Sequence, residues 1–150
     1  MKVLFAAVLY ISFLTSCVGK ENKEPEQVIE LADDSWIMEK YFQDIEGYDS
    51  VEYERIYFDW HDRFAMGPTD YRYRGVIHFT KEQATDLWDH YEWEQVAEAP
   101  DFVFENVNDE LIGNGPWYSC KQFENDNLST VNVFYAVFDG NVLIFDVQQY

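Results

Sequence analysis

Two clusters of carboxylates and imidazoles contain the residue types in this chain that could do chemistry. One cluster is Asp59-Trp60-His61-Asp62-Arg63, and in the other Asp86 and His90 are spaced i, i+4 with Asp89 between them. Carboxylates beside a histidine orient the imidazole and stabilise its charged form, which suits divalent-metal binding or general acid–base work. The candidate binding residues are therefore Asp59, His61, Asp62, Asp86 and His90.

The other interpretation of both clusters is a solvated surface with local ion pairs. The chain has 29 Asp and Glu residues but only three His, so chance adjacency is expected. Neither the H-E-x-x-H zinc motif nor the EF-hand pattern occurs, and no G-x-S-x-G, S-x-x-K or P-loop sequence is present. We therefore expect no metal, no cofactor and no enzymatic activity. A small-ligand or divalent-cation binding site is the alternative.

The charge balance restricts the class of partner. With 29 acidic and ten basic residues, the formal net charge is −19, and nucleic acid is excluded because its phosphates are met by Lys and Arg. Residues 82–150 contain a single base, so one functional interpretation is an acidic face that recruits a cationic protein or peptide. The other is a solubilising surface, in which Arg72 and Arg74 pair with Glu52 and Glu54 on a neighbouring strand.

The N-terminus has the features of a secretory signal. Lys2 is followed by the uncharged run Val3–Leu14. As a helix this run would span about 18 Å, against about 30 Å for the hydrocarbon core of a bilayer. It is therefore too short to cross a membrane and is typical of the apolar region of a signal peptide.

Leu14-Thr15-Ser16-Cys17 resembles the lipobox of bacterial lipoproteins, in which the cysteine carries a diacylglycerol thioether. The resemblance implies a signal peptide over residues 1–16, lipidation (palmitate-type acyl chains) of Cys17, and a flexible tether over residues 17–27. Two or three acyl chains anchor a protein stably. Position 18 is Val, where enterobacterial lipoproteins retained at the inner membrane have Asp, so the resemblance implies sorting to the outer membrane. Lys20-Glu21 and Lys23-Glu24 resemble the Lys-acid export tag of surface lipoproteins in the Bacteroidetes group, which implies the cell surface. The alternative is an ordinary secretory signal with a chance cysteine.

Lipidation of Cys17 would leave Cys120 without an intramolecular partner, so no disulfide is expected. Cys120 lies in residues 115–123, which have the composition of a strand. A free cysteine in an apolar strand is usually a small buried hydrophobe.

Residues 28–150 fit one domain. The whole chain is 19% aromatic and 47% hydrophobic, a composition that supports a folded core. Apolar periodicity predicts one helix that starts near Ser35 and ends at Gly47, and a second opened by the capping box Thr80-Lys81-Glu82-Gln83. Strands are predicted over residues 51–60, 71–79, 115–123, 131–138 and 142–148. The expected fold is α+β, with an antiparallel sheet of about five strands packed with two helices.

The last two strands flank Asp139-Gly140, a preferred two-residue hairpin turn. Such a turn would pair Phe138 with Asn141, Ala136 with Leu143 and Phe134 with Phe145. Both faces of this hairpin are apolar, so it is either covered on both sides or exposes an aromatic face to a partner.

Residues Tyr73–Ala84, Trp93 and Phe134–Val147 give the chain a pattern that resembles small uncharacterised α+β bacterial lipoproteins. This resemblance implies no activity. The expected function is a non-enzymatic interaction module for a protein or peptide, held at the bacterial cell envelope by lipid on Cys17.

Overall fold

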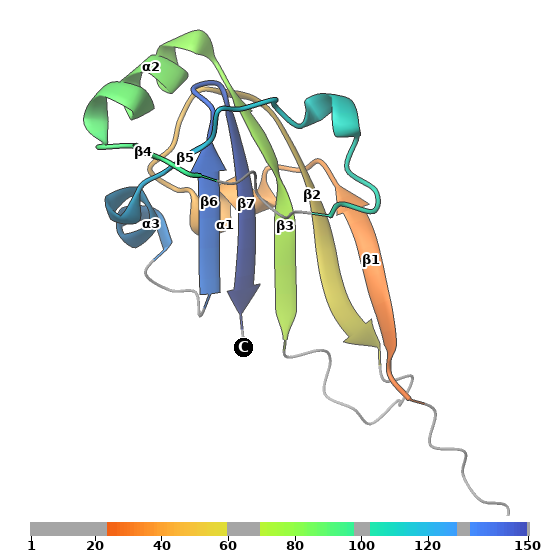
Figure 1. The fold of residues 1–150 in the computed structure, drawn as a ribbon. Coiled ribbons are helices and arrows are strands. Elements are labelled where there is room, and N and C mark those ends of the chain that lie inside the picture. The colour runs from red at the N-terminus through yellow and green to blue at the C-terminus, as the bar shows by residue number, and fades with distance from the viewer. Residues whose placement is uncertain (1–23, 60–69, 98–102, 129–132, 150) are drawn as a thin grey trace, which may run out of the picture.

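The computed structural model describes residues 24–59, 70–97, 103–128 and 133–149, and within them the chain forms one antiparallel seven-stranded sheet with three α-helices (Figure 1). The spatial order of the strands is β1-β2-β3-β7-β6-β5-β4. The strands are β1 (Glu26–Ala32), β2 (Tyr48–Asp59), β3 (Tyr71–Phe79), β4 (Glu94–Gln95), β5 (Tyr118–Ser119), β6 (Val133–Phe138) and β7 (Val142–Gln149). The helices are α1 (Trp36–Tyr41), α2 (Lys81–His90) and α3 (Lys121–Leu128), and a short 3-10 helix spans Asp109–Leu111.

The expected class, α+β with an antiparallel sheet, is confirmed, but the expected counts of about five strands and two helices were too low. β1 begins at Glu26, inside the segment expected to be tether. The expected strand over residues 115–123 is instead the two-residue β5 followed by α3. Cys120 is buried, as predicted, but it lies directly before α3, where its Sγ is 3.5 Å from the backbone nitrogen of Phe123.

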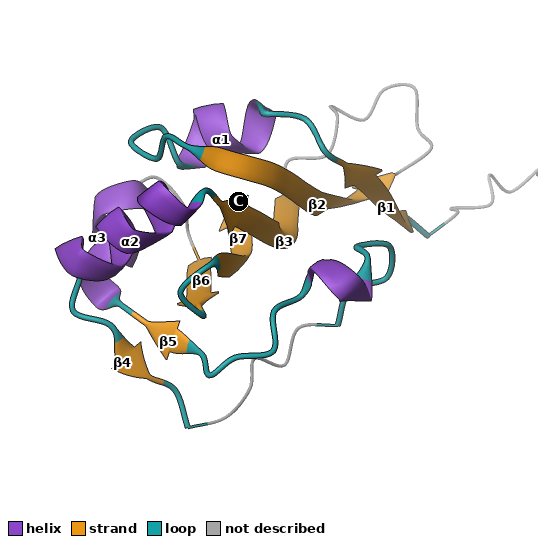
Figure 2. Cartoon of the chain, turned by 90° about the horizontal axis from the view of Figure 1, so that it is seen from above, coloured by secondary structure: helices purple, strands orange, loops and turns teal. Residues whose placement is uncertain are grey.

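The sheet has a different cover on each face (Figure 2). The helix face packs against α1, α2 and α3 through buried residues such as Met38, Leu87 and Phe123. The opposite face, here called the loop face, packs against residues 103–117, which contribute Val107 and Trp117. Side chains alternate along a strand, so each central strand needs apolar residues on both sides.

The closing hairpin satisfies that need. Leu143 and Phe145 belong to the core of the helix face, while Val142 and Ile144 belong to the core of the loop face. The prediction that the hairpin is covered on both sides is confirmed for these residues, although Tyr135 remains exposed.

The predicted register of the hairpin was wrong. Phe138 pairs with Leu143, Ala136 with Phe145 and Phe134 with Val147. The Asp139 carboxylate accepts the backbone N–H groups of Asn141 and Val142 at 3.0 and 2.7 Å, which stabilises a wider turn. The strands are displaced by two residues relative to the predicted pairing. An even displacement leaves every side chain on its predicted face.

The capping of α2 follows half of the predicted pattern. The Thr80 hydroxyl accepts the backbone N–H of Gln83 at 3.3 Å, as in a capping box. The backbone N–H of Thr80 donates to the carbonyl of Gly47 at 2.9 Å instead of to the Gln83 side chain. Gly47 has a positive φ of 79°, which brings this carbonyl to the start of α2. The first helix ends earlier than predicted, at Tyr41.

A buried ion pair holds residues 103–112 onto the loop face. Glu54 on β2 is 0% exposed, and its Oε2 accepts the Nε of Arg74 on β3 at 2.5 Å. Its Oε1 accepts the backbone N–H groups of Glu105 and Asn106, each at 2.5 Å. The Arg74–Glu54 pair expected for a solubilising surface is therefore present, but it is buried and does not belong to the surface.

Two further polar contacts fix the same segment. Glu52 accepts the backbone N–H of Asn108 at 2.7 Å, and Nε2 of His78 lies 2.9 Å from the carbonyl oxygen of Leu111. The predicted pairing of Arg72 with Glu52 was wrong, because Arg72 Nε donates to Asp146 on β7 at 2.8 Å. The segment is thus attached by side chains of β2 and β3 that point toward it.

The pKa of Glu54 is held below its ordinary value of 4.5. Burial alone would raise this pKa, but hydrogen bonds from Asn106, Arg74 and Glu105 to the charged carboxylate outweigh burial. Because this pKa is lower in the folded state, ionised Glu54 stabilises the fold fully at pH values above its unfolded-state pKa. This contribution is lost as the pH falls through the folded-state pKa.

We predict that Glu54→Gln lowers the free energy of unfolding by about 3–5 kcal/mol at pH 7. The largely buried Arg74 would then keep only the exposed carboxylate of Glu105, at 3.9 Å, as a counter-charge. In urea melts, the difference between wild type and variant should be complete above about pH 5 and should shrink in acid. Glu52→Gln on the same strand is the matched control. It removes a carboxylate that accepts a single backbone amide, so its cost should be nearer 1 kcal/mol. Equal losses for the two variants would contradict this account.

Phe145 is fully buried and its ring lies 5.3 Å from that of Phe42 in an edge-on arrangement. We therefore predict that Phe145→Ala costs about 3–5 kcal/mol in urea unfolding, through lost transfer energy and the cavity left behind. Tyr135→Ala, on the exposed part of β6, should cost about 1 kcal/mol or less. An unchanged midpoint for Phe145→Ala would mean that this face is an exposed partner surface.

Candidate functional site

A hollow of about 530 Å³ opens on the helix face where α1 meets the start of β3 and the end of β7. We call it the Trp36 hollow. Its lining residues are Trp36, Lys40, Arg55, Tyr71, Tyr73 and Gln149. They come from four elements, and each is at least partly accessible except Tyr73, which is buried at the base.

The spacing of the aromatic residues explains why they meet here. Tyr71 and Tyr73 alternate along β3 and so share the helix face, where their rings stack at 6.0 Å with an angle of 10°. Trp36 is the first residue of α1, and its ring lies 5.2 Å from that of Tyr73. The Trp36 ring is tilted by 47° from that of Tyr73, so the three rings form an angled aromatic lining with the buried Tyr73 at its base.

Two cations lie against this surface. The Nζ of Lys40 is 4.6 Å from the centre of the Trp36 ring and 4.8 Å from that of Tyr41, and the guanidinium carbon of Arg55 is 5.6 Å from Trp36. Cations are attracted to aromatic faces at these separations. Lys40 and Trp36 meet because residues four apart share a helix face.

Gln149 orders the cationic side of the hollow. Its Oε1 accepts hydrogen bonds from Lys40 Nζ and from the Tyr41 hydroxyl, each at 2.8 Å. Arg55 lies 3.8 Å from Glu30 on β1, a carboxylate that is about half exposed. The polar groups of the hollow are therefore held in position, while the Arg55–Glu30 contact is a long, solvent-accessible ion pair.

Burial determines the ionisation of the surrounding groups. It raises the pKa of Tyr73 to about 12 and raises that of Tyr41 further, so both phenols are neutral at physiological pH. Burial also lowers the pKa of Lys40, which reflects incomplete solvation of its ammonium. Among the residues that line the hollow, Lys40 and Arg55 are the charged ones, and both are cationic.

The structure places Asp59 apart from the cluster of Asp86, Asp89 and His90. Asp59 lies at the end of β2 that is far from α2, because Tyr48 at the other end of β2 pairs with Phe79, directly before α2. His61 and Asp62 lie outside the described residues. Asp86 and His90 are both exposed on α2, and the His90 ring packs edge-on against Tyr91 at 4.7 Å. In the described part of the chain, no three potential metal ligands gather in one place.

The residues of the Trp36 hollow were missed by sequence reasoning. The signals that could have found them were the i, i+4 pair Trp36 and Lys40 and the i, i+2 pair Tyr71 and Tyr73. Each pair predicts a shared face within one element. Neither pair indicates that α1 packs over the start of β3.

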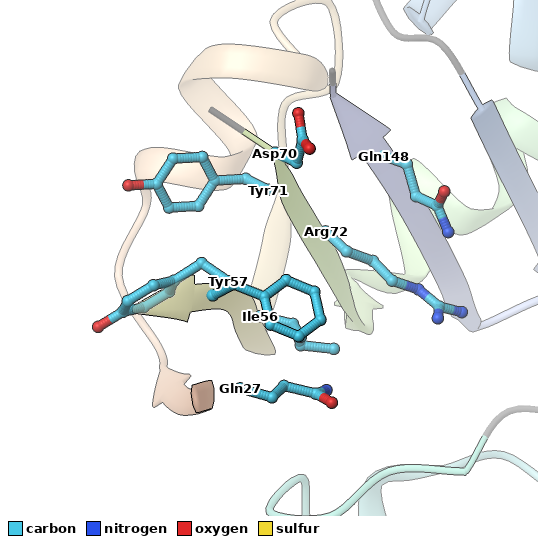
Figure 3. A pocket seen from close by; sticks show the side chains of 8 residues that line it. Gln27, Ile56, Tyr57, Asp70, Tyr71, Arg72 and Gln148 are labelled. Atoms are coloured by element: carbon cyan, nitrogen blue, oxygen red, sulfur yellow. The ribbon is translucent and has the colours of Figure 1, made fainter. Parts of the chain in front are cut away.

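A second hollow, of about 300 Å³, is lined by residues from β1, β2, β3 and β7, together with Asp70 (Figure 3). Its cation is Arg72, which already forms an ion pair with Asp146. It is therefore less suited than the Trp36 hollow to receive a charged ligand.

Comparisons with protein-family models, curated proteins and solved structures found no match to this chain. None of the helices in the described ranges has the length and apolar character needed to cross a bilayer. Functional inference therefore depends on the chemistry of the Trp36 hollow and on the N-terminal lipobox resemblance.

Proposed function

We propose that this chain is a lipid-anchored, non-enzymatic binding module of the bacterial cell envelope that takes a small anionic ligand in the Trp36 hollow. The observation that carries the proposal is the placement of Lys40 and Arg55 over a single indole ring. In a chain with a formal net charge of −19, this is a local concentration of positive charge.

Electrostatics favours an anion at this position. Two like charges beside one ring repel each other, and an anion between them would add two attractions that offset this repulsion. Arg55 interacts with Tyr53 and Asp34 and forms a long, half-exposed ion pair with Glu30. Exposed ion pairs of this last kind contribute only about 0–1 kcal/mol. A ligand carboxylate therefore loses little by displacing the contact with Glu30.

The rings and the amide define the rest of the ligand. Ligand sites combine an apolar or aromatic lining with a few placed polar groups that set orientation. The partly accessible rings of Trp36 and Tyr71 offer aromatic surface to the C–H face of a ligand ring, and Gln149 offers an amide beside them. The ligand class that fits is a ring-bearing carboxylate such as a sugar acid.

The envelope location is supported by the Leu14-Thr15-Ser16-Cys17 sequence and by Val18. An acylated Cys17 would hold the domain at the outer membrane or cell surface. There the tether would keep the Trp36 hollow within reach of ligands near that membrane.

We predict that Cys17→Ser moves the protein from the membrane fraction to the soluble fraction, because the thioether with diacylglycerol cannot form. The experiment is fractionation of cells that express the full chain. Cys120→Ser is the matched control and should leave the membrane fraction unchanged. Membrane retention of Cys17→Ser would overturn the lipid anchor without affecting the ligand proposal.

We predict that glucuronate binds to the domain and quenches its tryptophan fluorescence. Glucose, which lacks the carboxylate, and glucosamine, which is cationic, should bind more weakly. Lys40→Gln should weaken glucuronate binding by about tenfold or more, the value of one charge-assisted hydrogen bond. Lys121→Gln is the control, because Lys121 is 80% exposed, lies outside the hollow and contacts Glu124.

Trp36→Phe should remove the fluorescence change while calorimetry still detects binding. Equal affinity for glucuronate and glucose, or no binding of either, would contradict the proposal that the hollow selects an anionic ring-bearing ligand.

A further inference from the structure

β1 forms one edge of the sheet in the described part of the chain. In the described residues it pairs with β2 alone, over seven residues from Glu26 to Ala32. The strand at the opposite edge, β4, has only two residues. An edge strand presents a row of backbone donors and acceptors that can pair with another chain.

The only charged residues of β1 are the two acidic ones, Glu26 and Glu30. β1 contains no Lys, Pro or Gly, and the register with β2 runs without a bulge. Proteins commonly use such residues, bulges or short strands to prevent edge pairing. By length and regularity, β1 is therefore able to accept a further strand.

The two faces of β1 differ in chemistry. Ile29 and Leu31 share the loop face with Phe58 of β2, and Leu31 and Phe58 are 50% and 47% exposed. Glu26 and Glu30 lie on the helix face. A strand added beside β1 would therefore have Ile29 and Leu31 as neighbours on one face, and the two carboxylates alternating with Val28 and Ala32 on the other.

We propose that β1 binds an extended cationic peptide segment, with alternating basic and apolar residues, as an eighth strand of the sheet. Main-chain hydrogen bonds to β1 would supply affinity, and the alternate side-chain positions would supply specificity. Basic side chains lie beside Glu26 and Glu30, and apolar ones lie beside Ile29 and Leu31.

Charge complementarity selects this occupant over a second copy of the chain. Two β1 strands in contact would bring four glutamates together with no basic residue on either strand, and like charges on neighbouring strands are destabilising. The net charge of −19 repels a second copy at long range and attracts a cationic segment. This surface lies outside the residues that line the Trp36 hollow.

The test uses the mature domain without lipid and an acetylated seven-residue peptide of alternating lysine and valine. We expect saturable binding by calorimetry, together with slower amide hydrogen exchange confined to residues 26–32. Two matched peptides should fail: one with glutamate in place of lysine, and one with alternate backbone nitrogens methylated, which keeps the charge but removes main-chain donors.

Leu31→Lys should weaken peptide binding by about tenfold or more, since it removes an apolar neighbour and adds a like charge. Val103→Lys, an equivalent change at a residue that is 68% exposed and outside β1, is the control and should leave affinity unchanged. If the methylated peptide bound as tightly as the unmodified peptide, charge attraction alone would explain the binding, and strand addition would be overturned. Exchange protection of β1 in a peptide-free dimer would identify a second copy as the occupant. Glucuronate titration of the same samples separates this result from the ligand proposal.

Discussion

Glu54 places a carboxylate in the middle of a sheet whose two faces are both apolar, and the loop face is organised around the need to satisfy it. A buried charge without partners is costly by several kcal/mol, so its donors have to be present whenever the domain is folded. Arg74 comes from the neighbouring strand, but the other donors are backbone amides of residues 105 and 106. The burial of Glu54 is thus coupled to the docking of a segment with little regular structure, which in turn covers Val76 and Ile144.

The elements that could be predicted from sequence are those whose apolar period is long and consistent. β3 alternates over nine residues and α2 combines a cap with an apolar stripe, and both formed as expected. α3 and β1 were missed because each is short and polar along much of its length. In the hairpin, the alternation of side chains predicted which face each one occupies but not how the two strands are paired. The register of the two strands depends on the hydrogen bonds that the Asp139 carboxylate accepts within the turn.

The Trp36 hollow was not found from sequence for a related reason. Sequence reasoning grouped Asp59 with its neighbours and Asp86 with His90 because they are adjacent along the chain, yet the fold places Asp59 and α2 at opposite ends of β2. The Trp36 hollow combines residues from four elements that are separated by up to about a hundred positions. Its pairwise spacings are visible in sequence, but the packing of α1 over the start of β3 is a property of the tertiary structure.

Glu30 links the two proposed sites. It contacts Arg55 of the Trp36 hollow at 3.8 Å and accepts the Tyr57 hydroxyl at 2.9 Å, and it also lies on the strand proposed to bind a cationic segment. A basic side chain placed beside Glu30 would compete with Arg55 for the carboxylate, and Arg55 would then be more available to an anion in the hollow. Thermodynamic linkage makes such an effect reciprocal: a carboxylate that draws Arg55 away from Glu30 strengthens binding of the cationic segment by the same factor. The contact is half exposed, so this coupling is small, and the two sites are expected to function largely independently.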